Sequence, residues 1–221
     1  MKIVHDPALF ARVGLDVLEH LAKHQRPAVQ PAAEGGGVLS GRVVLVSSAH
    51  AGEGKSFVAW RLAHALAEQQ AGDVVWVDAA FDTPPAETDI SRRGAAGFSE
   101  IMTLGSLQGL APAGGGPDRL WRLGRGVLAQ RSLLLQPDAV RKGLMALRAG
   151  FALAVLDAPS LGGCGALLAE VDAVVMVADS RQTSRQAALQ ALAAAHIGPD
   201  RIAGVVLNRR PRAIPRWLGG D

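Results

Sequence analysis

The chain is 221 residues long, 49% of them are hydrophobic, and 23 basic residues stand against 20 acidic ones. This composition is typical of one α/β domain with a sizeable core. A formal charge of +3 does not by itself indicate a nucleic-acid partner, and we expect none. No apolar run reaches the roughly 18–20 residues of a membrane span, and the single cysteine, Cys164, excludes an internal disulfide or a multi-cysteine metal site.

The first part of the chain predicts a helix followed by a linker. Apolar residues recur at helical spacing over residues 7–24, after the helix-starting pair Asp6-Pro7. This helix could pack on the core or on a neighbouring subunit. Residues 26–41 contain two prolines and three consecutive glycines, which is typical of a linker. Because the N-terminus lacks the apolar core of a signal peptide, we expect a cytoplasmic protein. We expect an N-terminal helix and linker over 1–34, a P-loop ATP-binding domain over 35–208 and a basic tail over 209–221.

Residues 43–58, VVLVSSAHAGEGKSFV, carry the clearest functional signal in the chain. An apolar run leads into a loop of small residues and then into Lys55-Ser56, beside an expected helix over 57–70, which is the order of a P-loop. Small residues let the backbone N–H groups of such a loop wrap a phosphate, and the helix N-terminus adds the positive end of its dipole. We expect Lys55 to contact the β- and γ-phosphates and the Ser56 hydroxyl to ligate Mg²⁺. The candidate nucleotide-binding residues in this segment are Ala51, Gly52, Glu53, Gly54, Lys55, Ser56 and Phe57.

The rest of the chain alternates apolar runs with helical patterns. Runs that fit buried parallel strands span residues 73–77, 151–156, 173–178 and 202–207, with a weaker candidate at 120–123. Helices are expected over residues 98–104, 138–149 and 182–196, and surface loops over 81–97 and 105–118. This alternation predicts the α/β fold of a P-loop NTPase, with a mostly parallel sheet and helices on both faces.

Acidic residues follow three of the expected strands: Asp78, Asp157 and Asp179. In a parallel sheet the carboxyl ends of the strands meet at one edge, so Asp78 and Asp157 can both face the P-loop. A Mg²⁺ bound to phosphates needs oxygen ligands, or carboxylates that hold its water, on that side. We therefore expect Mg²⁺ at Ser56, Asp78 and Asp157, with Lys55, Asp78 and Asp157 as catalytic residues. Asp179 stays open between a strand-end cap and a ligand.

These motifs, in this order, resemble the bacterial tyrosine autokinases (BY-kinases) of capsule and exopolysaccharide assembly, relatives of the MinD/ParA ATPases. The similar stretches within residues 40–208 are SSAHAGEGKSF, VVWVDAAFDTP, FALAVLDAP, DAVVMVADSRQTSRQAALQAL and IAGVVLN, and more weakly GFSEIM and LWRLGRG. The resemblance implies a cytoplasmic P-loop domain, peripheral at the inner face of the membrane, that binds ATP and Mg²⁺ and docks on a membrane chain-length regulator. It also matches Asn208 to an adenine-contacting position of the wider superfamily.

The departures from the family pattern concern chemistry. The family's A′ motif, Asp-x-Asp-x-Arg, reads Asp78-Ala79-Ala80-Phe81-Asp82 here, so the second acid is Ala80 and the arginine is Asp82. The chain contains no tyrosine, so it cannot phosphorylate itself on tyrosine. The signature lysine of the MinD/ParA proteins is replaced by His50, and only Arg12 remains of the family's N-terminal oligomerisation motif.

Three functions stay open. The first is an ATP-binding, BY-kinase-like protein of exopolysaccharide or capsule biosynthesis with weakened phosphoryl transfer, in which Asp82 could replace the missing acid. The second is a MinD/ParA-type ATPase, and the third is a non-catalytic nucleotide-binding regulator of a polysaccharide-export complex. It therefore stays open whether the chain is an enzyme, which would then be a P-loop ATPase or a kinase-like protein. The chain could form a homo-oligomer in each case.

Arginines crowd the end of the chain. Cations beside apolar side chains could dock on an acidic partner or an anionic membrane surface, with a solvated tail as the alternative. The residues concerned are Arg209, Arg210, Arg212, Arg216, Trp217 and Leu218.

Overall fold

A seven-stranded sheet forms the centre of the protein, which is described here from a computed structural model. The structure describes residues 7–24, 41–69, 72–82, 97–105, 107, 111–112 and 116–209. The strand order is β3-β4-β2-β5-β1-β6-β7, and all neighbouring strands are parallel except for the antiparallel pair β3–β4. The strands are β1 (Arg42–Ser48), β2 (Val74–Asp78), β3 (Ala111–Pro112), β4 (Leu120–Leu123), β5 (Leu153–Asp157), β6 (Ala173–Asp179) and β7 (Ile202–Asn208).

The central strands are apolar runs because helices cover both faces of the sheet. Every residue of β2, β5 and β6 is buried, as expected for parallel strands between two layers of helices. Alternate residues of β1 join different cores: Val44 and Val46 pack with the helices of one face, and Val43 and Leu45 with those of the other. This confirms the predicted α/β class, with a mostly parallel sheet and helices on both faces.

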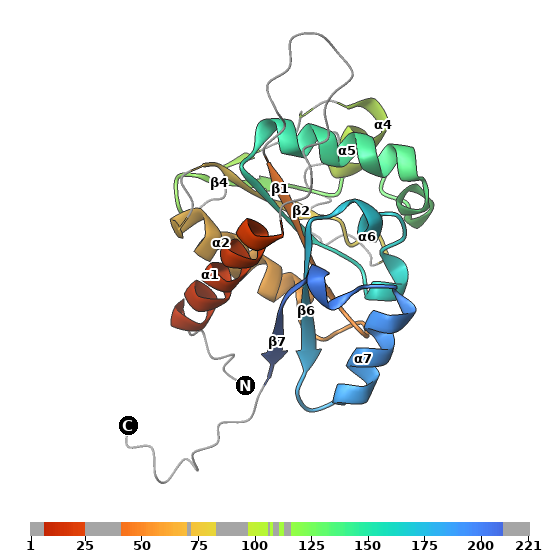
Figure 1. Cartoon of the computed structure of the whole chain (residues 1–221). Helices are drawn as coiled ribbons and strands as arrows, with labels where there is room; N and C mark the ends of the chain where they lie inside the picture. Colours follow the sequence, from red (N-terminus) through yellow and green to blue (C-terminus); the bar gives the residue numbers. More distant parts are fainter. Residues whose placement is uncertain are drawn as a thin grey trace.

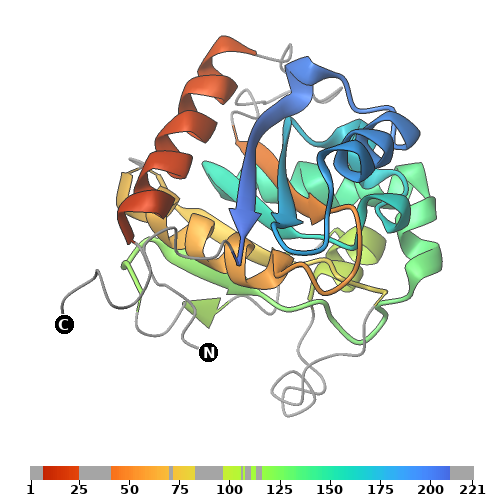
Figure 2. The ribbon, with the colours of Figure 1, turned by 90° about the horizontal axis from the view of Figure 1, so that it is seen from below.

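Of the helices in the described ranges, two cover one face of the sheet and the others cover the opposite face (Figures 1 and 2). The first face carries α1 (Pro7–Lys23) and α2 (Lys55–Gln69). The second carries α4 (Phe98–Leu104), α5 (Pro137–Gly150), α6 (Leu167–Glu170) and α7 (Arg185–Ala194). Short 3-10 turns lie at Arg131–Leu135, Leu161–Gly163 and Pro199–Arg201.

Helix α1 packs on the body of the protein, against α2 and β7 (Figure 2). Its residues Val17 and Leu21 are buried, and Phe10 meets Phe57 of α2 edge to face, with ring centroids 6.1 Å apart. The Gln69 side chain at the end of α2 donates a hydrogen bond to the Ala11 carbonyl at 2.8 Å. Of the two packings considered for this helix, the structure shows the one on the core of its own chain.

The boundaries of two helices differ from the predicted ones for local reasons. Helix α2 begins at Lys55, two residues before the predicted start, because the Val58 N–H already donates a helical hydrogen bond to the Gly54 carbonyl at 3.1 Å. Helix α7 begins at Arg185 rather than at residue 182, because the Ser184 hydroxyl caps it by accepting the N–H of Ala187 at 3.1 Å. The short strand β3 lies inside the segment 105–118 that was expected to be loop. In the part of the chain that the structure describes, no helix has the length and apolar character needed to cross a bilayer.

Candidate functional site

The loop between β1 and α2 has the backbone that its small residues predict. Gly52 and Gly54 adopt φ angles of +81° and +94°, which disfavour any residue with a side chain. A Cβ atom on Gly54 would also lie 2.1 Å from the side-chain nitrogen of Asn208. The loop therefore needs glycine at position 54 for two reasons, conformation and space.

Lys55 and Ser56 form the first turn of α2. The N–H groups of a first helical turn have no partners within the helix, and they carry the positive end of its dipole. Ala51 and Gly52 are exposed at the loop tip, whereas Phe57 is half-buried against α1, with the Arg61 guanidinium 5.7 Å from its ring centroid. The structure thus places Phe57 in the packing between helices, and the loop with Lys55 and Ser56 at the carboxyl edge of the sheet.

Asp78 and Asp157 lie side by side at this edge. They are paired in register across β2 and β5, and both are buried. Asp157 interacts with the Ser56 hydroxyl. Burial raises the pKa of Asp157 to about 7, and the neighbouring Asp78 carboxylate adds to the rise against the hydrogen bond from Ser56 and the positive charge of Lys55. Its Oδ1 atom is buried without a hydrogen-bond partner. The arrangement brings together the three predicted metal-side residues.

Arg125, which the sequence analysis did not select, pairs with Asp78. It follows β4 and lies at the same sheet edge, and its Nε and Nη2 atoms donate to the two Asp78 carboxylate oxygens at 2.9 and 3.1 Å. The backbone N–H of Ala80 donates to the same carboxylate at 3.1 Å. The signal that could have found Arg125 was its position two residues after an expected strand, inside the stretch LWRLGRG.

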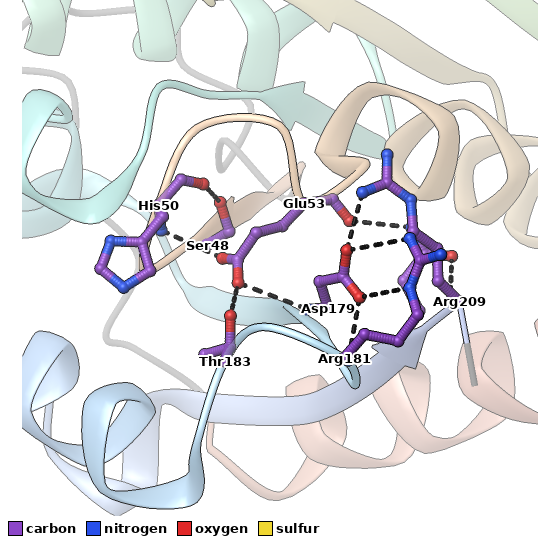
Figure 3. Close-up of polar contacts among 8 residues, drawn as sticks. Ser48, His50, Glu53, Asp179, Arg181, Thr183 and Arg209 are labelled. Atoms are coloured by element: carbon purple, nitrogen blue, oxygen red, sulfur yellow. Dashed lines mark hydrogen bonds and ion pairs between the residues drawn. The ribbon is translucent and has the colours of Figure 1, made fainter. Parts of the chain in front are cut away.

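The side chain of Glu53, in the loop between β1 and α2, lies in a polar network (Figure 3). Its buried carboxylate accepts the backbone N–H of His50 at 3.0 Å, the backbone N–H of Asp179 at 3.3 Å and the hydroxyl of Thr183. Burial alone would raise the pKa of Glu53, but these hydrogen bonds outweigh it and lower the pKa below its ordinary value. The Ser48 hydroxyl donates to the His50 carbonyl at 2.6 Å and steadies the same loop. Glu53 therefore joins the P-loop to the segment after β6.

Asn208 and Asp179 connect the end of β7 to the P-loop. The Asn208 amide donates to the Glu53 carbonyl at 2.8 Å. Asp179 accepts from Arg209 at 2.7 Å and from Arg181 at 3.3 Å (Figure 3), and these guanidinium groups hold the pKa of Asp179 well below its ordinary value. The sequence left open whether Asp179 is a strand-end cap or a ligand, and in the structure its carboxylate forms ion pairs with these two arginines. Arg209 is thereby engaged, and the remaining arginines of the basic tail lie outside the described residues.

The residues of the divergent A′ motif lie close to the site. Ala80 is buried, and Asp82 is exposed. An Asp82 carboxylate oxygen lies 3.7 Å from the point that a Cβ on Gly163 would occupy, beside the loop that follows Asp157. Cys164 is buried nearby as a free thiol, as its single occurrence predicted, and burial raises its pKa to about 12.

The donors at this edge fit a nucleotide-bound Mg²⁺. The oxygens of Ser56, Asp157 and Asp78 are of the kind that Mg²⁺ prefers, and the unpartnered Oδ1 of Asp157 leaves one oxygen free of protein hydrogen bonds. Across the ranges that the structure describes, no group of three or more His, Cys, Asp or Glu side chains could hold a metal ion.

No protein-family model matches the chain, and no curated protein matches it. Solved structures with similar folds include the kinase domain of VpsO, with 21% identity and a TM-score of 0.65 over 92% of this chain and 97% of that one. The kinase domain of the Escherichia coli tyrosine kinase ETK is similar over 80% of this chain and 72% of that one, with 18% identity and a TM-score of 0.63. A chain of the MinC:MinD cell division protein complex of Aquifex aeolicus is similar over 76% of this chain and 69% of that one, with 16% identity and a TM-score of 0.57. The resemblance drawn from the motifs is thus confirmed for the fold, which is that of BY-kinase domains and MinD/ParA-like P-loop proteins.

Proposed function

We propose that the chain binds ATP and Mg²⁺ at its P-loop, as a BY-kinase-like protein. The observation that carries the proposal is the position of Lys55 and Ser56 in the first turn of α2, where Ser56 interacts with Asp157, whose Oδ1 atom has no hydrogen-bond partner. A glycine loop with two left-handed residues precedes them, so the backbone N–H groups can close around an anion.

Each residue of the site has a defined task in this proposal. The loop amides from residues 51–56 bind the phosphates, and Lys55 adds a positive charge beside the β- and γ-phosphates. Ser56 and Asp157 would hold the Mg²⁺, and Asp78 would hold its water. When bound, the ion neutralises charge on the phosphates. The Asn208 amide fixes the Glu53 carbonyl, and so keeps the loop in shape.

We further propose that phosphoryl transfer is weakened. Ala80 stands where BY-kinases have a second acid, and the chain contains no tyrosine to phosphorylate. A role in exopolysaccharide or capsule assembly, at the inner face of the membrane with a chain-length regulator as partner, follows from the BY-kinase resemblance. A non-catalytic regulator would use the same binding site and differ only in turnover. His50 in place of the signature lysine makes a MinD/ParA-type ATPase the weaker alternative.

Thermal unfolding tests nucleotide binding. A ligand at about 100 times its dissociation constant stabilises a protein by about 2.7 kcal/mol, which corresponds to a rise in Tm of roughly 5–10 °C for a chain of this size. ATP with Mg²⁺ should produce this rise in the wild type and not in Lys55→Ala. Lys23→Ala is the matched control, because Lys23 is an exposed lysine of α1 that pairs with Glu19 on the same helix. An equal rise in Lys55→Ala would contradict the assignment.

A further inference from the structure

The loop that carries Arg125 is anchored to α4. The buried Glu100 carboxylate accepts the backbone N–H groups of Val127 and Leu128, both at 2.9 Å. The backbone N–H of Ser99 donates to the Arg125 carbonyl at 2.9 Å. The Phe98 N–H also donates to the Gly124 carbonyl at 2.9 Å. Hydrogen bonds on both sides of Arg125 therefore hold its backbone in place beside the sheet edge.

The guanidinium makes the two metal-side carboxylates unequal. Arg125 and Asp78 pair through two parallel hydrogen bonds, and their side chains are only 9% and 8% exposed. A bidentate guanidinium–carboxylate pair with little solvent around it is strong and geometrically specific. Asp157, the register partner of Asp78, instead keeps a buried oxygen without a partner and contacts Ser56.

We propose that Arg125 is a positioning residue that neutralises Asp78 and leaves Asp157 as the carboxylate that meets the Mg²⁺ of the bound nucleotide. This inference rests on the nucleotide binding proposed above. Before the nucleotide enters, Arg125 balances the charge of Asp78, and the positive charge of Lys55 lies near Asp157. Without Arg125, the site would present an excess negative charge to a polyphosphate from a buried position, where solvent screens little.

Calorimetric titration of ATP, with EDTA and then with Mg²⁺, tests the inference. In EDTA, Arg125→Ala should weaken ATP binding about tenfold or more, a typical coupling between two sites. The double variant Arg125→Ala/Asp78→Asn removes the uncompensated charge and should recover affinity to within about threefold of the wild type. Arg119→Ala is the matched control, because Arg119 is an exposed arginine just before β4, and it should bind like the wild type.

The Mg²⁺ response separates the two carboxylates without relying on Arg125→Ala. Asp157→Asn should lose the gain in ATP affinity that Mg²⁺ gives the wild type, and Asp78→Asn should keep most of it. A double variant as weak as Arg125→Ala, or equal loss of the Mg²⁺ gain in both asparagine variants, would overturn the inference. The proposed function itself would fail if the wild type bound no ATP, or if Lys55→Ala bound ATP as tightly as the wild type.

Discussion

Replacement of Glu53 should destabilise the protein even without nucleotide, although Glu53 belongs to the P-loop. The Glu53 carboxylate receives hydrogen bonds from His50, Asp179 and Thr183, which belong to two segments far apart in the chain (Figure 3). In Glu53→Ala, all three donors lose their acceptor. Asp179 is fully buried, so solvent cannot reach its N–H, whereas the exposed His50 and the half-buried Thr183 can be hydrated.

The size of the effect follows from these three contacts. A hydrogen bond to a charged group contributes about 1.5–3 kcal/mol, and water recovers part of this where the donor is accessible. We expect Glu53→Ala to lower the free energy of unfolding by about 2–4 kcal/mol, which corresponds to a loss of roughly 5–15 °C in Tm. Glu53→Gln keeps one acceptor oxygen for Thr183 and Asp179 but turns an amide N–H₂ toward the His50 N–H. Its loss should be about half as large.

Urea unfolding of the two variants and the wild type, without nucleotide, measures these differences. The expected order of stability is wild type, then Glu53→Gln, then Glu53→Ala. Values for Glu53→Ala within about 0.5 kcal/mol of the wild type, the size of an ordinary surface substitution, would refute the view that this network holds the loop to the β6–α7 segment.

The same network predicts a pH dependence. Hydrogen bonds hold the folded-state pKa of Glu53 below the ordinary value of 4.5, so the unfolded state takes up a proton first as the pH falls. The stability that Glu53 contributes is therefore fully present above that ordinary pKa and is lost as the pH falls through the lower, folded-state pKa. Glu53→Gln cannot titrate, so its deficit relative to the wild type should shrink below about pH 4.5. A constant deficit from pH 7 to pH 3 would contradict the assignment of the shift to Glu53.

Two further predictions concern the P-loop glycines and turnover. In urea unfolding, Gly54→Ala should destabilise the protein more than Gly52→Ala. Both glycines have a positive φ, which costs a residue with a side chain about 1–2 kcal/mol, but only a Cβ at position 54 would clash, with the Asn208 side chain. Equal losses would show that the Asn208 contact adds nothing. In a phosphate-release assay, the wild type should turn over well below the roughly 1–100 per second of ordinary kinases and Ala80→Asp should be faster. Turnover at ordinary rates that Asp82→Ala abolishes would instead identify Asp82 as the replacement acid.

Local patterns were sufficient to predict the parallel strands, though not β3, and to predict that Asp78 and Asp157 would lie at one edge of the sheet. Each strand between helices is a short apolar run, and parallel strands must place their carboxyl ends at one edge. The order of the strands could not be predicted, because a chain with crossover connections leaves open which strands become neighbours. The direct register pairing of Asp78 with Asp157, which depends on β2 lying beside β5, was therefore compatible with the sequence and not dictated by it.

The contacts that sequence reasoning missed join residues far apart in the chain. Arg125 pairs with Asp78 across 47 positions, and Thr183 reaches Glu53 across 130. Arg125 lies two residues after an expected strand, but arginine and threonine are both common at such positions, so this local signal is weak. Only the fold brings the loops after β4 and β6 to the edge that carries the P-loop.

These two contacts change how the acidic residues of the motifs should be counted. Residue type alone makes Glu53, Asp78, Asp157 and Asp179 equal candidates for a cation beside the phosphates. In the structure, amides and a hydroxyl satisfy Glu53, and arginines pair with Asp78 and Asp179. Among the buried carboxylate oxygens of the described ranges, only the Oδ1 atom of Asp157 has no hydrogen-bond partner. Because a buried carboxylate without a partner is costly, this oxygen has the most to gain from an incoming cation. The net charge beside a bound nucleotide therefore depends more on which acids are paired with arginines or hydrogen-bond donors than on the number of acids in the motifs.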